Sequence, residues 1–310
     1  MDDQLNITYI TFNGYVEVHK YRYVYFMILF TVYVLIICSN STIVYLIWIH
    51  KSLHEPMYIF IAALLINSVL YSTNIYPKLL TDVLSDKQII SYSACLFQWF
   101  AYYSLGGSEF LLLAVMSYDR YVSICKPLQY PTIMRRTTIN LLLLFSWLVP
   151  GCHVAVTVAW SADKKLCGFN LKGIFCNNSV YELHCVSSRA LSVYGVIVLF
   201  NIALFPMLFI VVTYINIFVI CYRSSRDVRK KAAETCTPHL LVLIGFSCLS
   251  VYDVVILRVE TDFPKTARLI MTLQMVLYNP LFNPIIYGLK LKEISKHIKK
   301  FCAKAKWIQT

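Results

Sequence analysis

Long apolar blocks constrain this chain more than any other feature. Seven of them recur between short polar connections, and each can supply the roughly 20 mostly apolar residues that a membrane-spanning helix needs. A transmembrane barrel would instead show short strands of alternating polarity, so only helices fit blocks of this kind. We therefore predict an all-α fold, a seven-transmembrane helix bundle, with spans at 24–49, 57–80, 95–119, 138–160, 190–222, 229–258 and 266–289.

The residue balance agrees with a membrane protein. Hydrophobic residues make up 58% of the chain and charged residues only 14%, a more apolar balance than soluble domains have. The spans leave little chain for a soluble domain. No apolar run precedes the first span, so we expect this span to serve as its own insertion signal.

Positive charge is distributed unevenly over the connections. With the N-terminus outside, the inner segments hold 17 of the 28 Lys and Arg residues against five acidic residues, and such an excess marks the cytosolic side. We expect a multi-pass protein of the plasma membrane with an extracellular N-terminus at 1–23 and a transmembrane domain at 24–290. The glycosylation sequons at Asn6 and Asn177 then lie outside. The basic excess points to membrane lipid and an intracellular partner, and not to nucleic acid.

The C-terminal segment, residues 291–310, carries a second pattern. Leu291, Ile294, Ile298 and Phe301 share one helical face, and lysines occupy the other. We predict a short amphipathic helix on the inner leaflet, followed by a cytoplasmic tail.

The third span combines a buried charge with a charged end. Glu109 stands among apolar residues, and an intramembrane carboxylate usually faces a bundle interior or a wet cavity. Arg120 follows eleven residues later, close to three helical turns, and therefore lies on the same face. Taken alone, Asp119 and Arg120 would form an ordinary interfacial salt bridge.

Tyrosines and glycines line the outer half of the same span. Helical spacing places Tyr102, Gly106 and Glu109 in one stripe, with Tyr103 and Gly107 beside it. Two glycines at this depth either open a cavity or allow close helix packing, and the spacing does not decide between them.

Four of the eleven cysteines lie on the expected outer side, where the compartment is oxidising. Cys95 stands at the outer end of the third span, and Cys167, Cys176 and Cys185 lie in the loop 161–189. Four cysteines permit three disulfide pairings, and the spacing alone does not select one. No Cys or His pair has convincing metal-ligand spacing, so we expect disulfides and no metal centre.

Two prolines, Pro280 and Pro284, interrupt the last span, and Asn283 and Tyr287 flank the second of them. Proline removes a backbone hydrogen bond and kinks the helix, and a nearby asparagine can bond the freed groups. The kink is either structural or a hinge.

Motifs spread from the first inner connection to the last span carry a resemblance. The set consists of DRY after the third span, NPxxY in the seventh, and the strings LHEPMY at 53–58, MSYDRYVSICKPLQY at 116–130, KAAETCTPHL at 231–240 and PLFNPIIY at 280–287. Together they resemble the rhodopsin-like (class A) G-protein-coupled receptors and, among these, the odorant receptors. The second-span run IAALLINSVL is similar to the fish-type branch.

The resemblance implies an odorant receptor that is not an enzyme and needs no cofactor. A small organic odorant would bind in the outer half of the bundle. A stimulatory heterotrimeric G protein of the olfactory type would dock on the inner side and raise cyclic AMP. The disulfides would pair Cys95 with Cys176 and Cys167 with Cys185. The coupling and activation residues would be Asp119, Arg120, Tyr121, Arg229, Lys230, Lys231, Asn283, Pro284 and Tyr287.

The resemblance also implies where the ligand would bind. The third-span stripe would be joined by residues of the outer loop and of the fifth, sixth and seventh spans. Such a lining is mostly apolar with a few hydroxyl groups, which suits a small organic molecule. The added positions are Asn178, Val198, Ile202, Ser250, Val251, Val254, Leu273 and Val276.

Two departures from the family pattern bear on function. The second span of the family usually carries an Asp that forms a cation site with the Glu of the third helix. Here Ser68 stands at that place, so Glu109 is a sodium candidate without its carboxylate partner. In the sixth span, Phe246-Ser247-Cys248 replaces the usual Phe-Tyr-Gly.

Two other function classes are open on the sequence. A class A receptor for another endogenous small ligand or a peptide would share the motifs. A transporter would also bury Glu109, but it would favour inverted repeats or matched broken helices, and the sequence shows neither.

Overall fold

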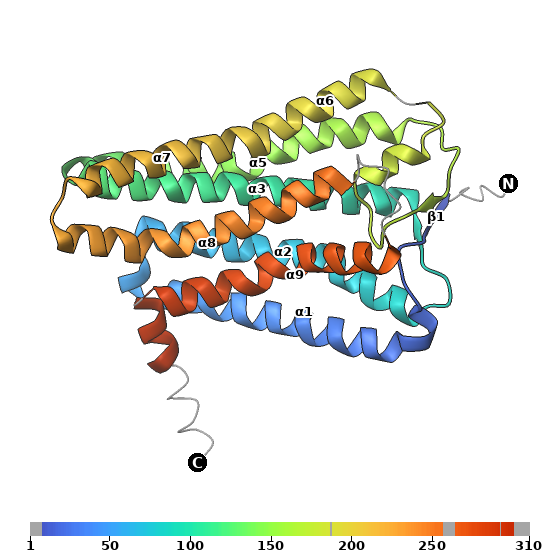
Figure 1. Cartoon of the computed structure of the whole chain (residues 1–310), viewed down its shortest axis with the longest axis horizontal. Coiled ribbons are helices and arrows are strands. Elements are labelled where there is room, and N and C mark those ends of the chain that lie inside the picture. Colours follow the sequence, from blue (N-terminus) through green and yellow to red (C-terminus); the bar gives the residue numbers. More distant parts are fainter. Residues whose placement is uncertain (1–7, 187, 257–263, 292, 301–310) are drawn as a thin grey trace, which may run out of the picture.

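Seven helical rods run along the long axis of the molecule (Figure 1). The computed structural model describes residues 8–186, 188–256, 264–291 and 293–300, without the side chains of some helical residues such as Lys231, Val251 and Val254. The rods are α1 (Val18–Ile49), α2 (Pro56–Leu84), α3 (Tyr92–Cys125), α5 (Arg136–Ala162), α6 (Arg189–Leu199) with α7 (Phe205–Tyr222), α8 (Arg226–Ile256) and α9 (Lys265–Lys290).

Short elements complete the described chain. A π-helical stretch, Phe200–Leu204, joins α6 to α7 without a break. The others are α4 (Tyr130–Ile133), 3-10 turns at Lys51–Leu53, Pro127–Gln129 and Asn178–Leu183, and the strands β1 (Tyr9–Phe12), β2 (Ile89–Ser91) and β3 (Asn170–Leu171).

The predicted all-α fold is confirmed, and the predicted spans differ from the helices mainly at their ends. α1 begins at Val18 and α3 continues to Cys125, so each is more than one turn longer than predicted. Local sequence sets several ends. Pro56 occupies the first turn of α2, where its missing N–H costs nothing. Ser188 caps α6, because its hydroxyl accepts a hydrogen bond from the Leu191 amide over 3.3 Å.

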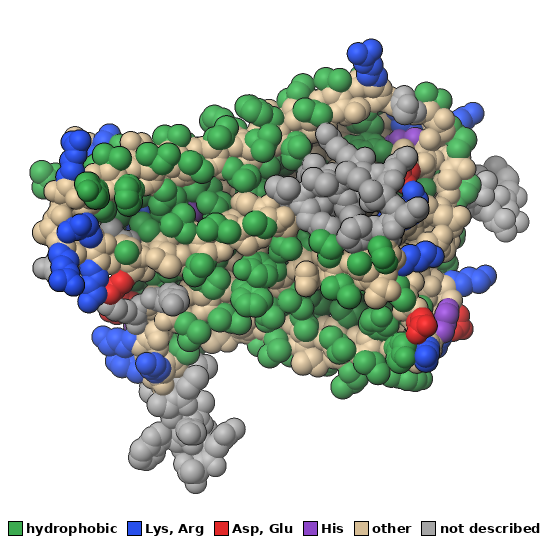
Figure 2. Space-filling view, in the orientation of Figure 1, with side chains coloured by type: hydrophobic (Ala, Val, Ile, Leu, Met, Phe, Trp, Pro, Cys, Tyr) green, Lys and Arg blue, Asp and Glu red, His purple; other side chains and the backbone are tan. Residues whose placement is uncertain are grey.

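The helices differ in how much apolar surface they present. Among the described residues, five helical segments are long and apolar enough to cross a membrane, and α8 adds a shorter apolar stretch, Cys236–Ser250. Hydrophobic side chains spread over the sides of the bundle, and Lys and Arg gather at its ends (Figure 2). This distribution fits a bundle whose sides contact lipid.

α3 is the central helix and packs against α2, α5 and α7. In Figure 1 it lies between a group containing α1, α2 and α9 and a group containing α5, α6 and α7. Its residues from Gly107 to Ser117 are all buried. A helix surrounded by others needs less apolar surface than a lipid-facing one, so α3 can carry Ser104, Ser108 and Glu109 inside the bundle.

An asparagine on α1 stabilises the kink of α9. Pro284 has no amide hydrogen and cannot bond the Pro280 carbonyl one turn before it. The side-chain amide of Asn40, fully buried, donates a hydrogen bond to that carbonyl over 2.7 Å. The freed acceptor is thus bonded from a neighbouring helix, which ties α1 to the kinked part of α9.

A small sheet that was not predicted from the sequence lies at the end of the bundle nearest the N-terminus, called the outer end after the predicted orientation. β1 is its middle strand, antiparallel to β2 and parallel to β3. Ile10 and Phe12 of β1 are buried in a cluster that includes Trp99 of α3 and the disulfide residues Cys95 and Cys176. The N-terminal strand is therefore part of the cover over the outer end of the bundle.

Residues 293–300 form the expected C-terminal helix, which turns away from α9 (Figure 1). Its apolar face packs on the bundle: Leu291 and Ile294 are buried in the main core, and Ile298 lies against it. Because this face contacts protein, it is not the surface that this helix offers to lipid.

Candidate functional site

Tyr102 anchors an aromatic cluster in the outer half of α3. Its ring lies 5.4 Å from that of Tyr71 on α2 and 5.0 Å from that of Phe175 in the outer loop, measured between centroids. Its hydroxyl donates to the sulfur of Met275 on α9 over 3.2 Å. Tyr102 therefore joins three helices and the outer loop, and it is almost fully buried.

Tyr103 holds the outer loop from the neighbouring position. The amide of Asn178 donates to the Tyr103 hydroxyl over 3.3 Å. The Asn178 side-chain oxygen accepts a hydrogen bond from the indole of Trp99 over 3.1 Å. Asn178 is thus fixed above α3 through its backbone and its side chain.

Gly106 and Gly107 have different surroundings. A Cβ atom built on Gly106 would have no atom within 4 Å apart from its chain neighbours and the backbone of its own helix. At Gly107 it would lie 2.9 Å from Cβ of Pro150 on α5 and 3.0 Å from Cδ1 of Ile202. The two glycines therefore differ: Gly106 faces open space, whereas Gly107 allows close helix packing.

The other predicted lining residues are brought together only in part. Leu273 and Val276 of α9 lie in the same apolar cluster as Tyr102 and Tyr103. Val198 of α6 and Ile202 after it are buried, and Ser250 of α8 is half-buried. The side chains of Val251 and Val254 lie outside the described part of the chain.

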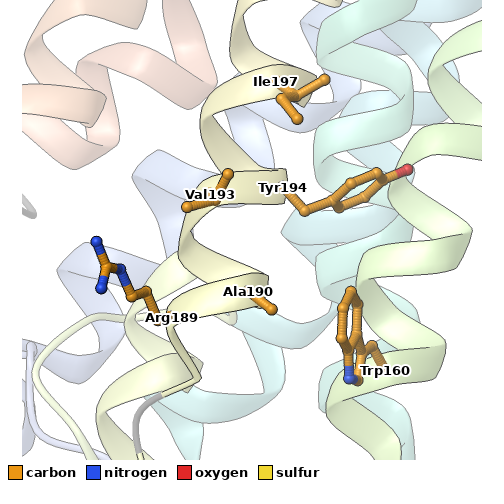
Figure 3. A pocket seen from close by; sticks show the side chains of 6 residues that line it. All are labelled: Trp160, Arg189, Ala190, Val193, Tyr194 and Ile197. Carbon is orange, nitrogen blue, oxygen red and sulfur yellow. The ribbon is translucent and has the colours of Figure 1, made fainter.

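A separate groove of ≈540 Å3 lies on the outer part of α6, beside α5 (Figure 3). Tyr194 points toward α5, where its hydroxyl donates to the His153 carbonyl over 3.4 Å. Trp160 and Val193 are exposed on the surface of the bundle. None of the predicted ligand-binding residues lines this groove; its lining is Trp160, Arg189, Ala190, Val193, Tyr194 and Ile197.

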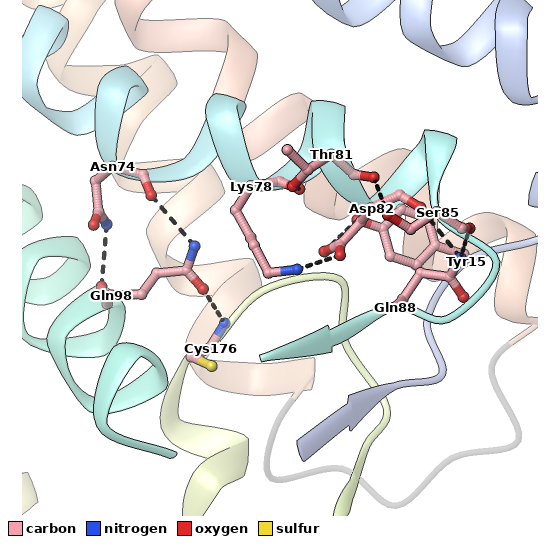
Figure 4. Close-up of polar contacts among 9 residues, drawn as sticks. All are labelled: Tyr15, Asn74, Lys78, Thr81, Asp82, Ser85, Gln88, Gln98 and Cys176. Carbon is pink, nitrogen blue, oxygen red and sulfur yellow. Dashed lines mark hydrogen bonds and ion pairs between the residues drawn. The ribbon is translucent and has the colours of Figure 1, made fainter. Parts of the chain in front are cut away.

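A polar network fixes the outer cover to α2 and α3 (Figure 4). The side chain of Gln98 on α3 accepts from the Cys176 amide over 2.9 Å and donates to the Asn74 carbonyl over 3.3 Å. Asp82 on α2 pairs with Lys78 and accepts from the Tyr15 hydroxyl over 3.4 Å. Burial and the Asp82 carboxylate raise the pKa of Tyr15, so this hydroxyl remains a donor.

Both expected disulfides are present in this cover. Cys95 pairs with Cys176 at a Cα–Cα distance of 5.4 Å, which attaches the outer loop to α3. Cys167 pairs with Cys185 at 4.8 Å and closes a loop within the same connection. The sequon residue Asn177 follows Cys176, and its side-chain oxygen accepts from the Ser179 amide over 3.0 Å. Its glycosylation remains a prediction, and Asn6 lies outside the described residues.

Glu109 is buried at the centre of a polar group. The side-chain amide of Asn283 donates to its carboxylate over 3.1 Å and to the Ser68 hydroxyl over 3.2 Å. The Asn279 and Asn283 side-chain oxygens and the Tyr287 hydroxyl are buried without a hydrogen-bond partner among the described residues. No group of three or more His, Cys, Asp or Glu side chains in the described chain is placed to hold a metal ion. Sodium at Glu109 remains a prediction.

Asp119 and Arg120 are paired at the inner end of α3. The Asp119 carboxylate is fully buried and accepts from Nε of Arg120 over 3.0 Å. It also accepts from the Tyr130 hydroxyl over 2.8 Å. Burial and the adjacent Asp119 raise the pKa of Tyr130, which keeps this hydroxyl protonated as a donor. Arg120 is thus held beside its neighbour by a carboxylate that a second group orients.

The inner ends of α3, α7 and α8 meet beside this pair. Tyr121 packs on a cluster of Ile217 and Cys221 from α7 and Cys236 from α8. One turn further into the bundle, the Tyr214 hydroxyl is hydrogen-bonded to the buried His239. Arg229 and Lys230 are exposed at the inner end of α8, and the side chain of Lys231 lies outside the described part.

Comparison with known proteins decides the family. A family model described as olfactory receptor matches residues 29–305, which is nearly the whole chain. The chain belongs to the olfactory receptor family. Olfactory receptor 4B1 of Homo sapiens is 34% identical over 304 residues and 96% of both chains. Olfactory receptor 4B13 of Mus musculus is 32% identical over 304 residues, 96% of this chain and 97% of its own. Olfactory receptor 4S2 of Homo sapiens is 32% identical over 302 residues, 95% of this chain and 94% of its own.

Membership in the olfactory receptor family confirms several predictions. Olfactory receptors are G-protein-coupled, non-enzymatic, multi-pass membrane proteins, so the chain acts with a ligand and a G protein. The seven-helix bundle agrees with this class. The fish-type branch remains a prediction.

Several residues of this olfactory receptor were missed at the sequence level. Trp99 and Tyr130 bond predicted site residues directly, and His239 bonds Tyr214 between two helices. Tyr130 and His239 both stand inside the strings that carry the resemblance, which was the available signal. Trp99 stood one turn before Tyr103 with no motif to mark it.

Proposed function

We propose that this olfactory receptor binds a small organic odorant in the outer half of the bundle and activates a stimulatory, olfactory-type G protein that raises cyclic AMP. The observation that carries the proposal is the arrangement along α3. Its outer half presents Tyr103 and the open space at Gly106, and its inner end carries the Asp119–Arg120 pair. A ligand that favours one arrangement of this helix would change what can dock at the other end.

The odorant would lie between α3 and the helices that face it, beneath Asn178. The open space at Gly106 gives room, and the Tyr103 hydroxyl is a polar group that can orient a ligand. Apolar neighbours such as Leu273 and Val276 would exclude water. No charged side chain belongs to the proposed lining, so an uncharged or weakly polar molecule fits best.

The G protein would dock at the inner ends of α3, α7 and α8. Release of Arg120 from Asp119 would free its guanidinium for the partner, and the exposed Arg229 and Lys230 would border the docking surface. Asn283, Pro284 and Tyr287 would shift with α9, because the Asn279 and Asn283 side-chain oxygens and the Tyr287 hydroxyl are buried without a partner among the described residues and can take new ones. The charge count supports a cytosolic location for this end and an extracellular N-terminus.

A screen of water-soluble and volatile odorants, with a cyclic AMP readout in cells that express the olfactory stimulatory G protein, tests the proposal. Arg120→Ala should abolish the response to any active odorant and leave surface delivery intact. Arg136→Ala, at an exposed basic residue that begins α5 at the same end of the bundle, is the matched control and should respond normally. An active odorant that changes cyclic AMP equally through Arg120→Ala and the wild type would refute the coupling role.

Two further measurements test the ligand site and the orientation. Tyr103→Ala should change odorant preference more than surface delivery, and equal loss of both would count against the site. Engineered glycosylation sequons within 223–236 should stay unmodified if this segment is cytosolic. Glycan attachment there would reverse the proposed orientation.

A further inference from the structure

A hollow lined by basic side chains lies at the inner end of the bundle, outside the proposed coupling surface. Its volume is ≈450 Å3. It is formed between the last turn of α9 and the C-terminal helix 293–300, and its lining consists of Leu289, Ser295, Lys296, Lys299 and Lys300.

The C-terminal helix presents these lysines because its apolar side is occupied. Ile294 is fully buried, and Ile298 packs against the main core, with its Cδ1 atom 3.2 Å from the point where a Cβ atom on Gly288 would lie. In Figure 1 the helix turns away from the direction of α9. A helix that leaves the end of a membrane span in this way runs along the membrane surface, and here it does so without a free apolar face. Contact with the leaflet must therefore come from its polar side.

The three lysines act as one cationic group. Lys296, Lys299 and Lys300 are all exposed, and their spacing places them on one side of the helix. None of them forms an ion pair with another described residue. The nearby Glu293 is exposed on the same helix but does not line the hollow. The hollow thus concentrates positive charge with no internal counter-charge.

Leu289 makes one side of the hollow apolar. It belongs to the last turn of α9, and 71% of its surface is exposed. The apolar sides of the bundle meet the basic end at this point, where the headgroups of the inner leaflet would lie. A molecule bound here can contact the lysines with a polar head and Leu289 with an apolar chain.

We propose that this hollow binds an inner-leaflet phospholipid whose headgroup carries phosphate monoesters, with the phosphates on Lys296, Lys299 and Lys300 and an acyl chain along Leu289. Phosphate monoesters carry about −1.5 to −2 charges each at neutral pH, whereas the diester of an ordinary phospholipid carries a single charge. Three convergent ammonium groups therefore favour the monoester headgroup over phosphatidylserine. The Ser295 hydroxyl adds a hydrogen-bond donor. The proposal rests on the cytosolic orientation in the proposed function, and not on the odorant or the G protein.

Native mass spectrometry of the purified full-length receptor tests this site directly. The receptor is placed in micelles with equimolar phosphatidylinositol bisphosphate, phosphatidylserine and phosphatidylcholine, and the bound lipids are counted. The wild type should retain the bisphosphate lipid in preference to the other two. The combined variant K296Q/K299Q/K300Q should lose roughly a hundredfold in affinity for it, because each basic side chain near a lipid surface contributes about fivefold.

The control variant K87Q/K164Q/K165Q removes three basic charges at the outer end and should bind the bisphosphate lipid as the wild type does. Thermal unfolding in phosphatidylcholine alone should be the same for both triple variants, since the substituted side chains are on the surface. Equal retention of phosphatidylserine, or undiminished binding by K296Q/K299Q/K300Q, would overturn the proposal. Equally tight binding of soluble inositol trisphosphate would also overturn it, since the occupant would then be a free phosphate compound.

Discussion

Asn283 donates its side-chain amide to the carboxylate of Glu109 over 3.1 Å, so one hydrogen bond joins the kinked part of α9 to the centre of α3. The same amide group also donates to Ser68 of α2 over 3.2 Å. Both donor hydrogens of Asn283 are therefore used inside the bundle. Replacing Ser68 by an acidic residue would place a second carboxylate beside that of Glu109. Two neighbouring carboxylates repel each other unless a cation lies between them.

Ser68→Asp should make the stability of the receptor depend on sodium. Two carboxylates beside the unpartnered oxygens of Asn279 and Asn283 would supply the oxygen ligands that a hard cation prefers. We expect the melting temperature of Ser68→Asp to rise by several degrees when choline chloride is replaced by sodium chloride. The wild type and the neutral control Ser68→Asn should shift less. An equal sodium response in all three would show that Asp at this position is unnecessary.

The two glycines of α3 offer a matched pair for testing the proposed ligand site. Gly106→Ala adds a methyl group to open space and gains up to about 1 kcal/mol of helix propensity. It should leave thermal stability unchanged or higher, and it should weaken responses to the bulkiest active odorants. Gly107→Ala forces its methyl group against Pro150 and Ile202, and such overpacking costs about 1–3 kcal/mol. It should lower the melting temperature. Similar stability and odorant profiles for both variants would contradict the distinction.

Tyr130→Phe should raise basal cyclic AMP. The Tyr130 hydroxyl orients the buried Asp119 carboxylate that holds Arg120, and a hydrogen bond to a charged group contributes about 1.5–3 kcal/mol. Without this bond, the resting arrangement should lose roughly tenfold or more in relative population. Tyr222→Phe, at an exposed tyrosine at the inner end of α7, is the control and should leave basal activity unchanged. Unchanged basal activity of Tyr130→Phe at normal surface level would contradict this role of Tyr130.

The sequence predicts those features that a single helix encodes. Span positions follow from apolar length, and the inward direction of Glu109 follows from the cost of a carboxylate in lipid. The pairing of Arg120 with Asp119 is equally local. The rest depends on which helices approach one another. Spacing treats Gly106 and Gly107 alike, and only the positions of Pro150 on α5 and of Ile202 separate their roles.

Long-range contacts explain the other misses. A polar Asn40 inside the first span predicts a hydrogen bond to a neighbouring helix, which is confirmed, but its partner, the Pro280 carbonyl 240 residues away, could not be predicted. The strand β1 has four residues, too few for a periodic signal, and it is held by neighbours on either side and by burial of Ile10 and Phe12. The amphipathic pattern at 291–301 predicted the C-terminal helix, but not that its apolar face would pack on the bundle.

The two disulfides should differ in importance, and their loss can be compared within one protein. The Cys95–Cys176 bond joins residues separated by 81 positions, and the Cys167–Cys185 bond joins residues separated by 18. In the chain-entropy description these loops correspond to about 4.5 and about 3 kcal/mol of stabilisation at 25 °C. Cys95 and Cys176 are also buried in the same cluster as Ile10 and Phe12 of β1, so their loss disturbs the packing of β1 and Trp99.

Cys95→Ser should therefore stop delivery to the cell surface, and Cys167→Ser should reduce it less. Cys248→Ser, at an exposed free cysteine, is the control and should leave delivery unchanged. Flow cytometry of an N-terminal epitope on intact cells measures all three, and normal delivery of Cys95→Ser would contradict the structural role of the first disulfide.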